Sequence, residues 1–291
     1  MNEKLKIEKL TFEYLTETTK RVKKLAAQGK GREVLGEVIN RPEDTEIGID
    51  RVGEDILAKL VKQYNIKVTI FSEPEGRDIK NGREPDFYGS VDPFDGSVLY
   101  LRGFEHNWYT VLSFFDKERK PICCGIADIL NEKFYISGEK GNYCLDVKSG
   151  KRKKILPSER KKLTEPIVLA SYLMSSQYSK KFLDVFGDLI HNMHPKALLY
   201  PNGGAYIYAY LASGLVDAYV MFDEPRSEID PGYPIAKNVG CQIVSVNRDG
   251  SFKDYEFIPG KQHDKVDLLI AASTPQLRDK LIRIFREAKD S

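Results

Sequence analysis

The stretch VDPFDGSVLY, residues 91–100, carries the side chains that could most readily do chemistry. Asp92 and Asp95 lie three positions apart with a proline between them. Aspartate and proline are poor in strand interiors, so we expect a strand that arrives at Val91 and stops there. A stiff turn at the proline can direct both carboxylates and the Phe94 carbonyl to one side.

Oxygen groups arranged in this way suit a hard cation. Mg²⁺ takes oxygen ligands in an octahedral array and retains water, so carboxylates and a carbonyl can hold it without histidine. Gly96 and Ser97 begin the next element, where backbone amides can cradle a phosphate that also contacts the cation. On this motif alone, the alternative that Asp92 and Asp95 only cap a turn stays open.

Further candidates lie where the sequence predicts strand ends or helix starts. Three are acidic and could converge with the aspartate pair: Asp50, Glu73 and Asp230. Tyr172 and Asn202 lie near predicted strand ends and are candidates for substrate contact, with core and turn roles as the alternative.

The first half of the chain must position most of these groups. Apolar residues at helical spacing predict a helix over residues 2–27 and a second one from Asp50 to about Tyr64. Short strand-like runs between residues 108 and 147 predict an antiparallel sheet with hairpins. The basic run at 148–162 then separates the halves, and we interpret it as a solvated hairpin and linker rather than an anion-binding patch.

The second half alternates strand-like and helical patterns, which is typical of α/β architecture. Helices are predicted at 176–192, 203–214 and 231–239, and a capped helix closes the chain. We therefore expect two domains, residues 1–155 with an antiparallel sheet and residues 156–291 with an α/β layout.

Composition limits the partners. A net charge of +2 gives no bulk attraction to nucleic acid or to an anionic membrane, and the basic run lacks interleaved aromatic residues. No apolar run is long enough to span a membrane, and the charged N-terminus is unlike a signal peptide, so we expect a cytoplasmic protein. The four cysteines include no C-x-x-C spacing and are expected to be reduced, mostly buried thiols.

Several segments in order resemble one family. VDPFDGS is similar to the D-P-[IL]-D-G-[ST] signature of the inositol monophosphatase and fructose-1,6-bisphosphatase superfamily. FSEP and DTEIGID resemble its G-E-E and D-x-V-T-x-x-D segments. GGAYIYAYLASGLVDAYV is similar to G-[ST]-A-A-x-x-x-x-x-V-A-x-G-x-x-D-A-Y, and EIDPGYPIAKNVGCQIV resembles W-D-x-A-A-x-x-x-I-x-x-E-A-G-G. Several motifs at family spacing argue strongly against the turn-cap alternative.

The resemblance implies a layered αβαβα sandwich, a homodimer and a lithium-sensitive phosphatase that uses two or three Mg²⁺ ions, with Mn²⁺ as a second option. It also implies the roles of particular residues. The metal ligands would be Glu73, Asp92, the Phe94 carbonyl, Asp95 and Asp230. Asp50, Glu73 and Ser97 would be catalytic, with Ser97 and Asp50 orienting the water that attacks phosphorus, and the Gly96 and Ser97 amides would hold phosphate oxygens.

Departures from the family pattern bear on the substrate. Ile229 replaces the tryptophan before the last aspartate, and Met221 stands where inositol monophosphatases present a glutamate. The link FDEPRSEID reads as longer and carries Arg226, which resembles archaeal-type enzymes acting on both fructose-1,6-bisphosphate and inositol phosphate. Arg226 could reach a sugar hydroxyl or a second phosphate, or it could instead form a surface salt bridge with Glu224 or Glu228.

Three functions therefore remain under comparison. The favoured one is hydrolysis of a small phosphorylated sugar or polyol. A 3'(2'),5'-bisphosphate nucleotidase shares the metal motifs but needs an adenine pocket in the second half. A catalytically silent metal-binding scaffold of the same fold is the third, and retention of all the expected ligands argues against it.

Overall fold

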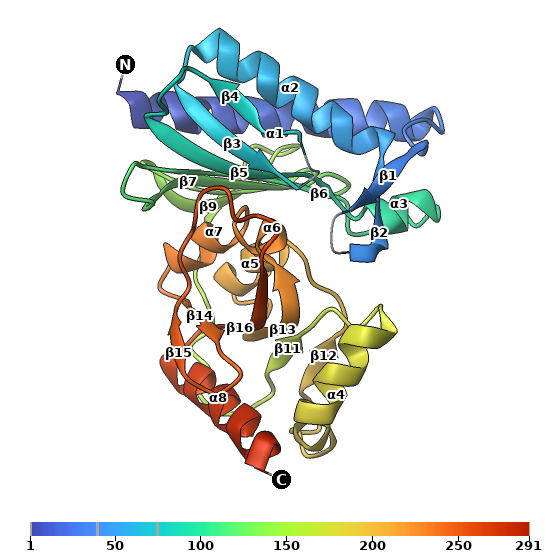
Figure 1. The fold of residues 1–291 in the computed structure, drawn as a ribbon, viewed down its shortest axis with the longest axis vertical. Helices are drawn as coiled ribbons and strands as arrows, with labels where there is room; N and C mark the ends of the chain where they lie inside the picture. Colours follow the sequence, from blue (N-terminus) through green and yellow to red (C-terminus); the bar gives the residue numbers. More distant parts are fainter. Residues whose placement is uncertain (1, 39–40, 74–75, 291) are drawn as a thin grey trace.

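The computed structural model describes residues 2–38, 41–73 and 76–290. Its elements stack as helices, sheet, helices, sheet and helices (Figure 1), which is the expected layered αβαβα sandwich. Three buried apolar clusters fill the spaces between these layers. None of the helices in the described ranges is long and apolar enough to cross a membrane.

The first layer consists of α1 (Glu3–Ala27) and α2 (Gly48–Tyr64), which pack on each other and on one face of the large sheet. Each buries an apolar stripe, represented by Leu10 on α1 and Leu57 on α2. Gly53 of α2 lies so close to the aspartate segment that an added Cβ would stand 2.9 Å from the Pro93 Cβ. The second helix is therefore seated directly behind the candidate metal ligands.

The large sheet has eight strands in the order β10-β9-β8-β7-β6-β5-β3-β4. Their bounds are β3 (Val68–Ser72), β4 (Ile79–Asn81), β5 (Phe87–Asp95), β6 (Tyr109–Phe115), β7 (Pro121–Asp128), β8 (Lys133–Gly138), β9 (Gly141–Asp146) and β10 (Arg152–Lys154). All neighbours pair antiparallel except β3 and β5, which are parallel. A two-stranded sheet of β1 (Val34–Val38) and β2 (Arg41–Ile47) precedes α2.

The expectation that the strand stops at Val91 is wrong. β5 continues to Asp95, but its pairing with β6 slips: Asp92 faces Val111 and Asp95 faces Tyr109, so β5 holds one extra residue. In a regular strand, positions three apart point to opposite faces, and the extra residue of a bulge re-aims one of them. The proline is tolerated because it lies within this irregularity. The short helix α3 (Ser97–Leu101) follows at once.

The second sheet has six strands in the order β12-β11-β13-β16-β14-β15. Their bounds are β11 (Val168–Ala170), β12 (Leu198–Tyr200), β13 (Ala218–Pro225), β14 (Gln242–Val246), β15 (Phe252–Asp254) and β16 (Lys265–Ala272). Helices α4 (Ser176–His191) and α8 (Pro275–Asp290) cover its outer face. Helices α5 (Ile207–Ala212) and α7 (Tyr233–Lys237) lie between the two sheets, and the single turn α6 (Arg226–Ile229) follows β13.

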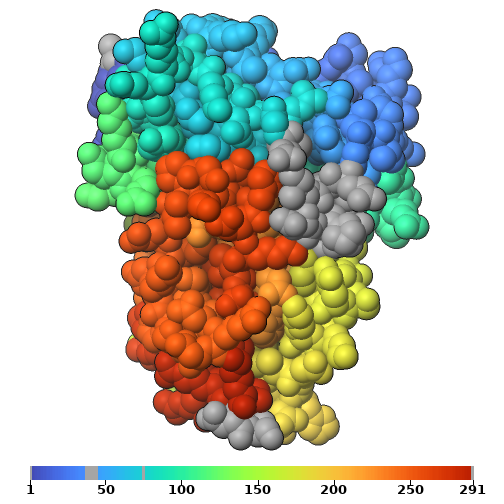
Figure 2. All heavy atoms as spheres, in the orientation of Figure 1, coloured from blue at the N-terminus to red at the C-terminus, as the bar shows by residue number. Residues whose placement is uncertain are grey.

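The two halves are in direct contact (Figure 2). The largest buried cluster joins residues of both sheets, among them Val111 from β6 and Leu269 from β16. The first sheet ends at Lys154 and the second begins at Val168, while a domain boundary after residue 155 stays a prediction.

All four cysteines are unpaired, and three of them are buried, as expected.

Candidate metal centre and active site

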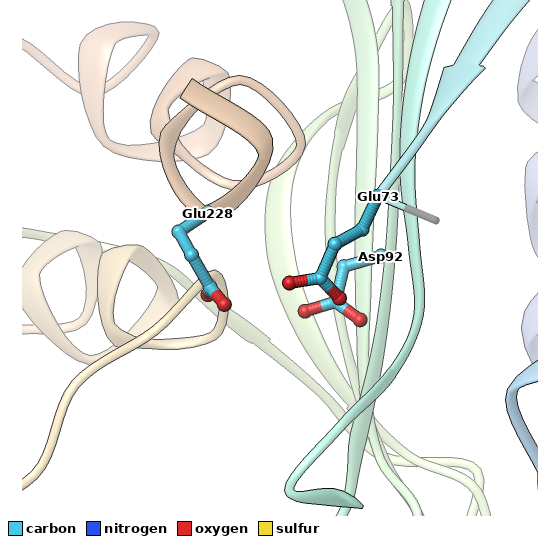
Figure 3. A group of neighbouring side chains, drawn as sticks. All are labelled: Glu73, Asp92 and Glu228. Carbon is cyan, nitrogen blue, oxygen red and sulfur yellow. The ribbon is translucent and has the colours of Figure 1, made fainter. Parts of the chain in front are cut away.

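Three carboxylates converge where the two halves meet. Glu73, Asp92 and Glu228 each present an oxygen, and these oxygens lie within 4.8 Å of one another. Figure 3 shows Glu228 reaching from α6 toward Glu73 and Asp92 on the large sheet. Parallel pairing of β3 and β5 sets Ser72 opposite Val91, so the carboxyl ends of these strands, with Glu73 and Asp92, lie side by side. The cluster therefore draws on segments far apart in the sequence.

The charges in this cluster are costly without a counter-ion. Asp92 is 1% exposed and Glu228 is 7% exposed. Burial raises the pKa of Asp92 well above its usual range, and the nearby carboxylates of Asp95, Glu73 and Glu228 raise it further. A divalent cation would remove this repulsion, and an all-oxygen donor set fits a hard cation such as Mg²⁺. The residues present therefore fit the expected metal.

A loop of the second half holds two of the carboxylates. The Tyr206 amide donates to Asp95 Oδ2 and the Ala205 amide donates to Glu228 Oε2, both at 3.1 Å. Gly204 precedes them with φ +118°, and a Cβ there would stand 2.7 Å from Asp95 Oδ2. This close approach requires glycine. Adjacent amides thus connect a carboxylate of the first sheet with one of the second half.

Ser97 and Asp50 are paired, as the resemblance implies. Ser97 Oγ lies 3.0 Å from Asp50 Oδ1 and 2.9 Å from the Phe94 carbonyl oxygen, and it can donate to either. The other oxygen, Asp50 Oδ2, accepts a hydrogen bond from the Ile47 amide at 2.7 Å. The start of α2 therefore fixes Asp50, and Asp50 orients the serine hydroxyl.

A cavity opens over these groups. Eight residues predicted to belong to the site line it: Glu73, Asp92, Phe94, Asp95, Gly96, Ser97, Tyr172 and Asn202. Its second-half wall also contains Met174, Tyr178, Met221 and Glu224. Glu224 is buried and its Oε1 accepts a hydrogen bond from the Tyr219 hydroxyl at 2.6 Å. The cavity thus combines a carboxylate cluster with a wall that is partly apolar.

Comparison with known proteins identifies the family. The model of the inositol monophosphatase family matches residues 6–290. The chain belongs to the inositol monophosphatase family. This is a phosphatase family, so the protein is assigned as a phosphatase of this family. A search of curated proteins finds no match.

Solved structures share the fold. The MJ0109 gene product, named inositol monophosphatase-fructose 1,6 bisphosphatase, aligns with a TM-score of 0.72 and 22% identity over 95% of this chain and 98% of its own. The SuhB protein of Bartonella henselae aligns at the same TM-score with 16% identity, over 95% and 98% of the two chains. Protein PH1897 of Pyrococcus horikoshii, described as having similarities to inositol-1 monophosphatase, is 25% identical with a TM-score of 0.67 over 94% and 96%.

The sequence predicted Asp230 as the last metal ligand of this inositol monophosphatase family member, whereas the structure brings Glu228, and not Asp230, to Glu73 and Asp92. Asp230 is 1% exposed, does not line the cavity, and accepts a hydrogen bond from the Tyr255 hydroxyl at 2.7 Å. Burial raises its pKa to about 7, although Arg226 and Tyr255 act in the opposite direction. Glu228 instead occupies the place opposite Glu73.

The sequence did contain a signal for Glu228. In the pattern W-D-x-A-A-x-x-x-I-x-x-E-A-G-G, twelve positions separate the aspartate from the first glycine of the closing pair. Twelve positions before Gly240 stands Glu228, whereas Asp230 is ten positions away. Matching residue type selected Asp230, whereas matching the spacing selects Glu228, the acid that the structure places beside Glu73 and Asp92. When the link is counted from β13 to Glu228 instead of Asp230, it is two residues shorter, and it no longer exceeds the length in the family pattern.

Arg226, a candidate for substrate contact from the sequence, lies away from the cavity lining. It does not line the cavity, and its guanidinium lies 3.7 Å from Asp230 Oδ1 and 4.6 Å from the centre of the Tyr255 ring. It donates to the Glu256 carbonyl as well. Nor does Arg226 lie at the surface, as the salt-bridge alternative required, because it is 9% exposed and lies beside the buried Asp230.

Proposed function

We propose that this family member is a Mg²⁺-dependent phosphomonoesterase that hydrolyses small phosphorylated sugars or polyols. The observation that carries the proposal is the convergence of Glu73, Asp92 and Glu228 at a cavity that Ser97 also lines. Carboxylate ligands beside a hydroxyl held by a second carboxylate are the groups that metal-assisted hydrolysis needs. A silent scaffold would have no use for the ordered pair of Ser97 and Asp50.

Glu73, Asp92, Glu228, Asp95 and the Phe94 carbonyl would hold two or three Mg²⁺ ions, with Mn²⁺ as a substitute. Such ions activate water as a nucleophile and neutralise the phosphate and the leaving oxygen. With Glu228 in place of Asp230 in the proposed set, the number of carboxylate ligands is unchanged. Protons compete for the same oxygens, so we expect binding to weaken as the pH falls.

The protein groups around the ions would orient the reactants. When the Ser97 hydroxyl donates a hydrogen bond to Asp50, the lone pairs of Oγ are available to accept a hydrogen bond from the attacking water. The amides of Gly96 and Ser97 begin α3 at the cavity wall and would hold phosphate oxygens. Asp95, fixed by the Tyr206 amide, would lie on the side of the second half.

The leaving group would contact the wall of the second half, where Asn202 and Tyr172 offer polar groups. Fructose-1,6-bisphosphate and inositol-1-phosphate remain the two favoured substrates. The name of the MJ0109 gene product, inositol monophosphatase-fructose 1,6 bisphosphatase, includes activities on both substrates. Arg226 no longer supports the bisphosphate, since it does not line the cavity. Tyr178 and Met174 could pack on an adenine, which keeps the nucleotidase alternative in the test.

The test is phosphate release from fructose-1,6-bisphosphate, inositol-1-phosphate and 3'-phosphoadenosine 5'-phosphate, with Mg²⁺, with EDTA and with added Li⁺. Asp95→Asn is the inactivating variant. Asp223→Asn is its matched control, because Asp223 lies on β13 outside the cavity lining and pairs with Lys181. We expect Mg²⁺-dependent turnover of a sugar or polyol phosphate, lost in Asp95→Asn and kept in Asp223→Asn.

Turnover of the nucleotide alone would transfer the assignment to the nucleotidase. A folded protein that releases phosphate from none of the three would support the silent scaffold. We also propose a homodimer, which light scattering coupled to size-exclusion chromatography would measure.

A further inference from the structure

Glu228 stands on a single helical turn that cannot be stable by itself. One turn fixes several backbone torsions for very few hydrogen bonds, so α6 must be held from outside. The segment between β15 and β16 supplies part of that support. The Arg226 amide donates to the Asp264 carbonyl at 3.0 Å, and the Ser227 amide donates to the Gln262 carbonyl at 2.7 Å. These bonds fix where the turn begins.

Side chains hold the opposite face of the turn. Residues four apart on a helix share a face, while a residue two positions along points away from them. Arg226 and Asp230 are such a pair, and Glu228 lies between them in sequence and faces the cavity. The Asp230 amide also donates to the Arg226 carbonyl at 2.7 Å, which closes the turn.

Tyr255 completes a buried group with this pair. Its hydroxyl donates to Asp230 Oδ1 at 2.7 Å, and its ring lies 4.6 Å from the Arg226 guanidinium, which is 3.7 Å from the same Asp230 oxygen. Arg226 is 9% exposed, and Asp230 and Tyr255 are 1% exposed each. A buried charge pair with hydrogen bonds is sensitive to the loss of any one partner. The turn that carries Glu228 therefore has one defined orientation.

We propose that Arg226, Asp230 and Tyr255 are positioning residues that direct Glu228 toward Glu73 and Asp92. None of the three lines the cavity, so they act only through the carboxylate that does. The inference rests on the proposed function in one respect, that Glu228 binds a cation. It assigns Asp230 and Arg226 a role that differs from ligand and substrate contact.

The experiment is Mn²⁺ binding to the full-length protein, followed by electron paramagnetic resonance of the free ion. Tyr255→Phe removes one hydroxyl and keeps the ring beneath Arg226. Because the substitution removes no charged side chain, the buried ion pair of Arg226 and Asp230 stays in place and the protein is expected to fold. We expect the same number of bound Mn²⁺ ions with affinity lowered about three- to tenfold, the factor for one buried hydrogen bond. Tyr64→Phe is the matched control, because Tyr64 makes the same kind of bond to Glu13 on α1.

Coupling to Glu228 separates positioning from general stability. In the Glu228→Gln background, Tyr255→Phe should change Mn²⁺ affinity no further, since the group through which it acts is gone. Equal losses in both backgrounds, or no loss in Tyr255→Phe, would overturn the positioning role.

Asp230→Asn tests the ligand assignment. It should keep the number of bound ions, whereas Glu228→Gln should lose a site or bind far more weakly. A site lost in Asp230→Asn and kept in Glu228→Gln would also overturn the proposal. A wild-type protein that binds no Mn²⁺ would overturn the proposed function together with it.

Discussion

Replacing Glu54 with glutamine should remove a large part of the pH dependence of stability. Glu54 lies on α2 and is 5% exposed, Ser72 Oγ donates to its Oε1 at 2.8 Å, and Arg77 Nε lies 3.7 Å from its Oε2. Burial raises its pKa from 4.5 to about 7, against the lowering effects of Ser72 and Arg77. Glutamine keeps an acceptor for Ser72 and cannot ionise.

The sign follows from proton linkage. Between the two pKa values the folded state binds more protons at Glu54 than the unfolded state, so the free energy of unfolding falls as the pH rises. The stabilisation is complete below about pH 4.5 and is lost as the pH rises through about 7. At about 1.4 kcal/mol per pH unit, the whole change is about 3 kcal/mol, of which about 2 kcal/mol falls between pH 5.5 and 8.5.

Urea unfolding in EDTA at these two pH values measures the effect. The wild type should lose about 2 kcal/mol more than Glu54→Gln between pH 5.5 and 8.5. Asp184→Asn is the control, because Asp184 is an exposed acid on α4 that does not act on Glu54 and should leave the wild-type dependence in place. If Glu54→Gln showed the same pH dependence as the wild type, the reasoning from burial would be refuted.

Three further predictions concern the site. Gly96→Ala should lower the free energy of unfolding by at least about 2 kcal/mol in chemical denaturation, because φ is +116° and the new Cβ would stand 2.2 Å from the Asn107 carbonyl oxygen. Ser97→Ala should lower kcat at least about a hundredfold with little change in KM, while Ser97→Thr should keep most of it. Mg²⁺ at about 100 times its Kd should stabilise the wild type by about 2.7 kcal/mol in thermal unfolding, and Glu228→Gln should lose much of this gain.

The sequence predicted the layers because their patterns are strong. The apolar repeat of α1 has a helical period, and β6 to β9 are short strand-like runs separated by turn residues, so element type and order followed from these patterns. The bulge in β5 could not be predicted in this way, since it depends on the register with β6. The parallel pairing of β3 with β5 is likewise a long-range property.

At the candidate site, local motifs located the groups that lie close together in sequence. Asp92, Asp95 and Ser97 come from one stretch, and all three line the cavity. Glu228 and Asp230 differ by two positions, which on a helical turn is the difference between facing the cavity and facing the buried Tyr255. Residue type favoured the aspartate, and only spacing or the fold distinguishes the two.

The most direct test of the account is phosphate release from inositol-1-phosphate by EDTA-treated enzyme during stepwise restoration of Mg²⁺, with Glu228→Gln beside the wild type. The account predicts no release in EDTA, recovery with Mg²⁺, and at least about a hundredfold lower kcat/KM in Glu228→Gln at the same Mg²⁺. Undiminished release in EDTA, or wild-type activity in Glu228→Gln, would contradict a metal-dependent site built across the two halves.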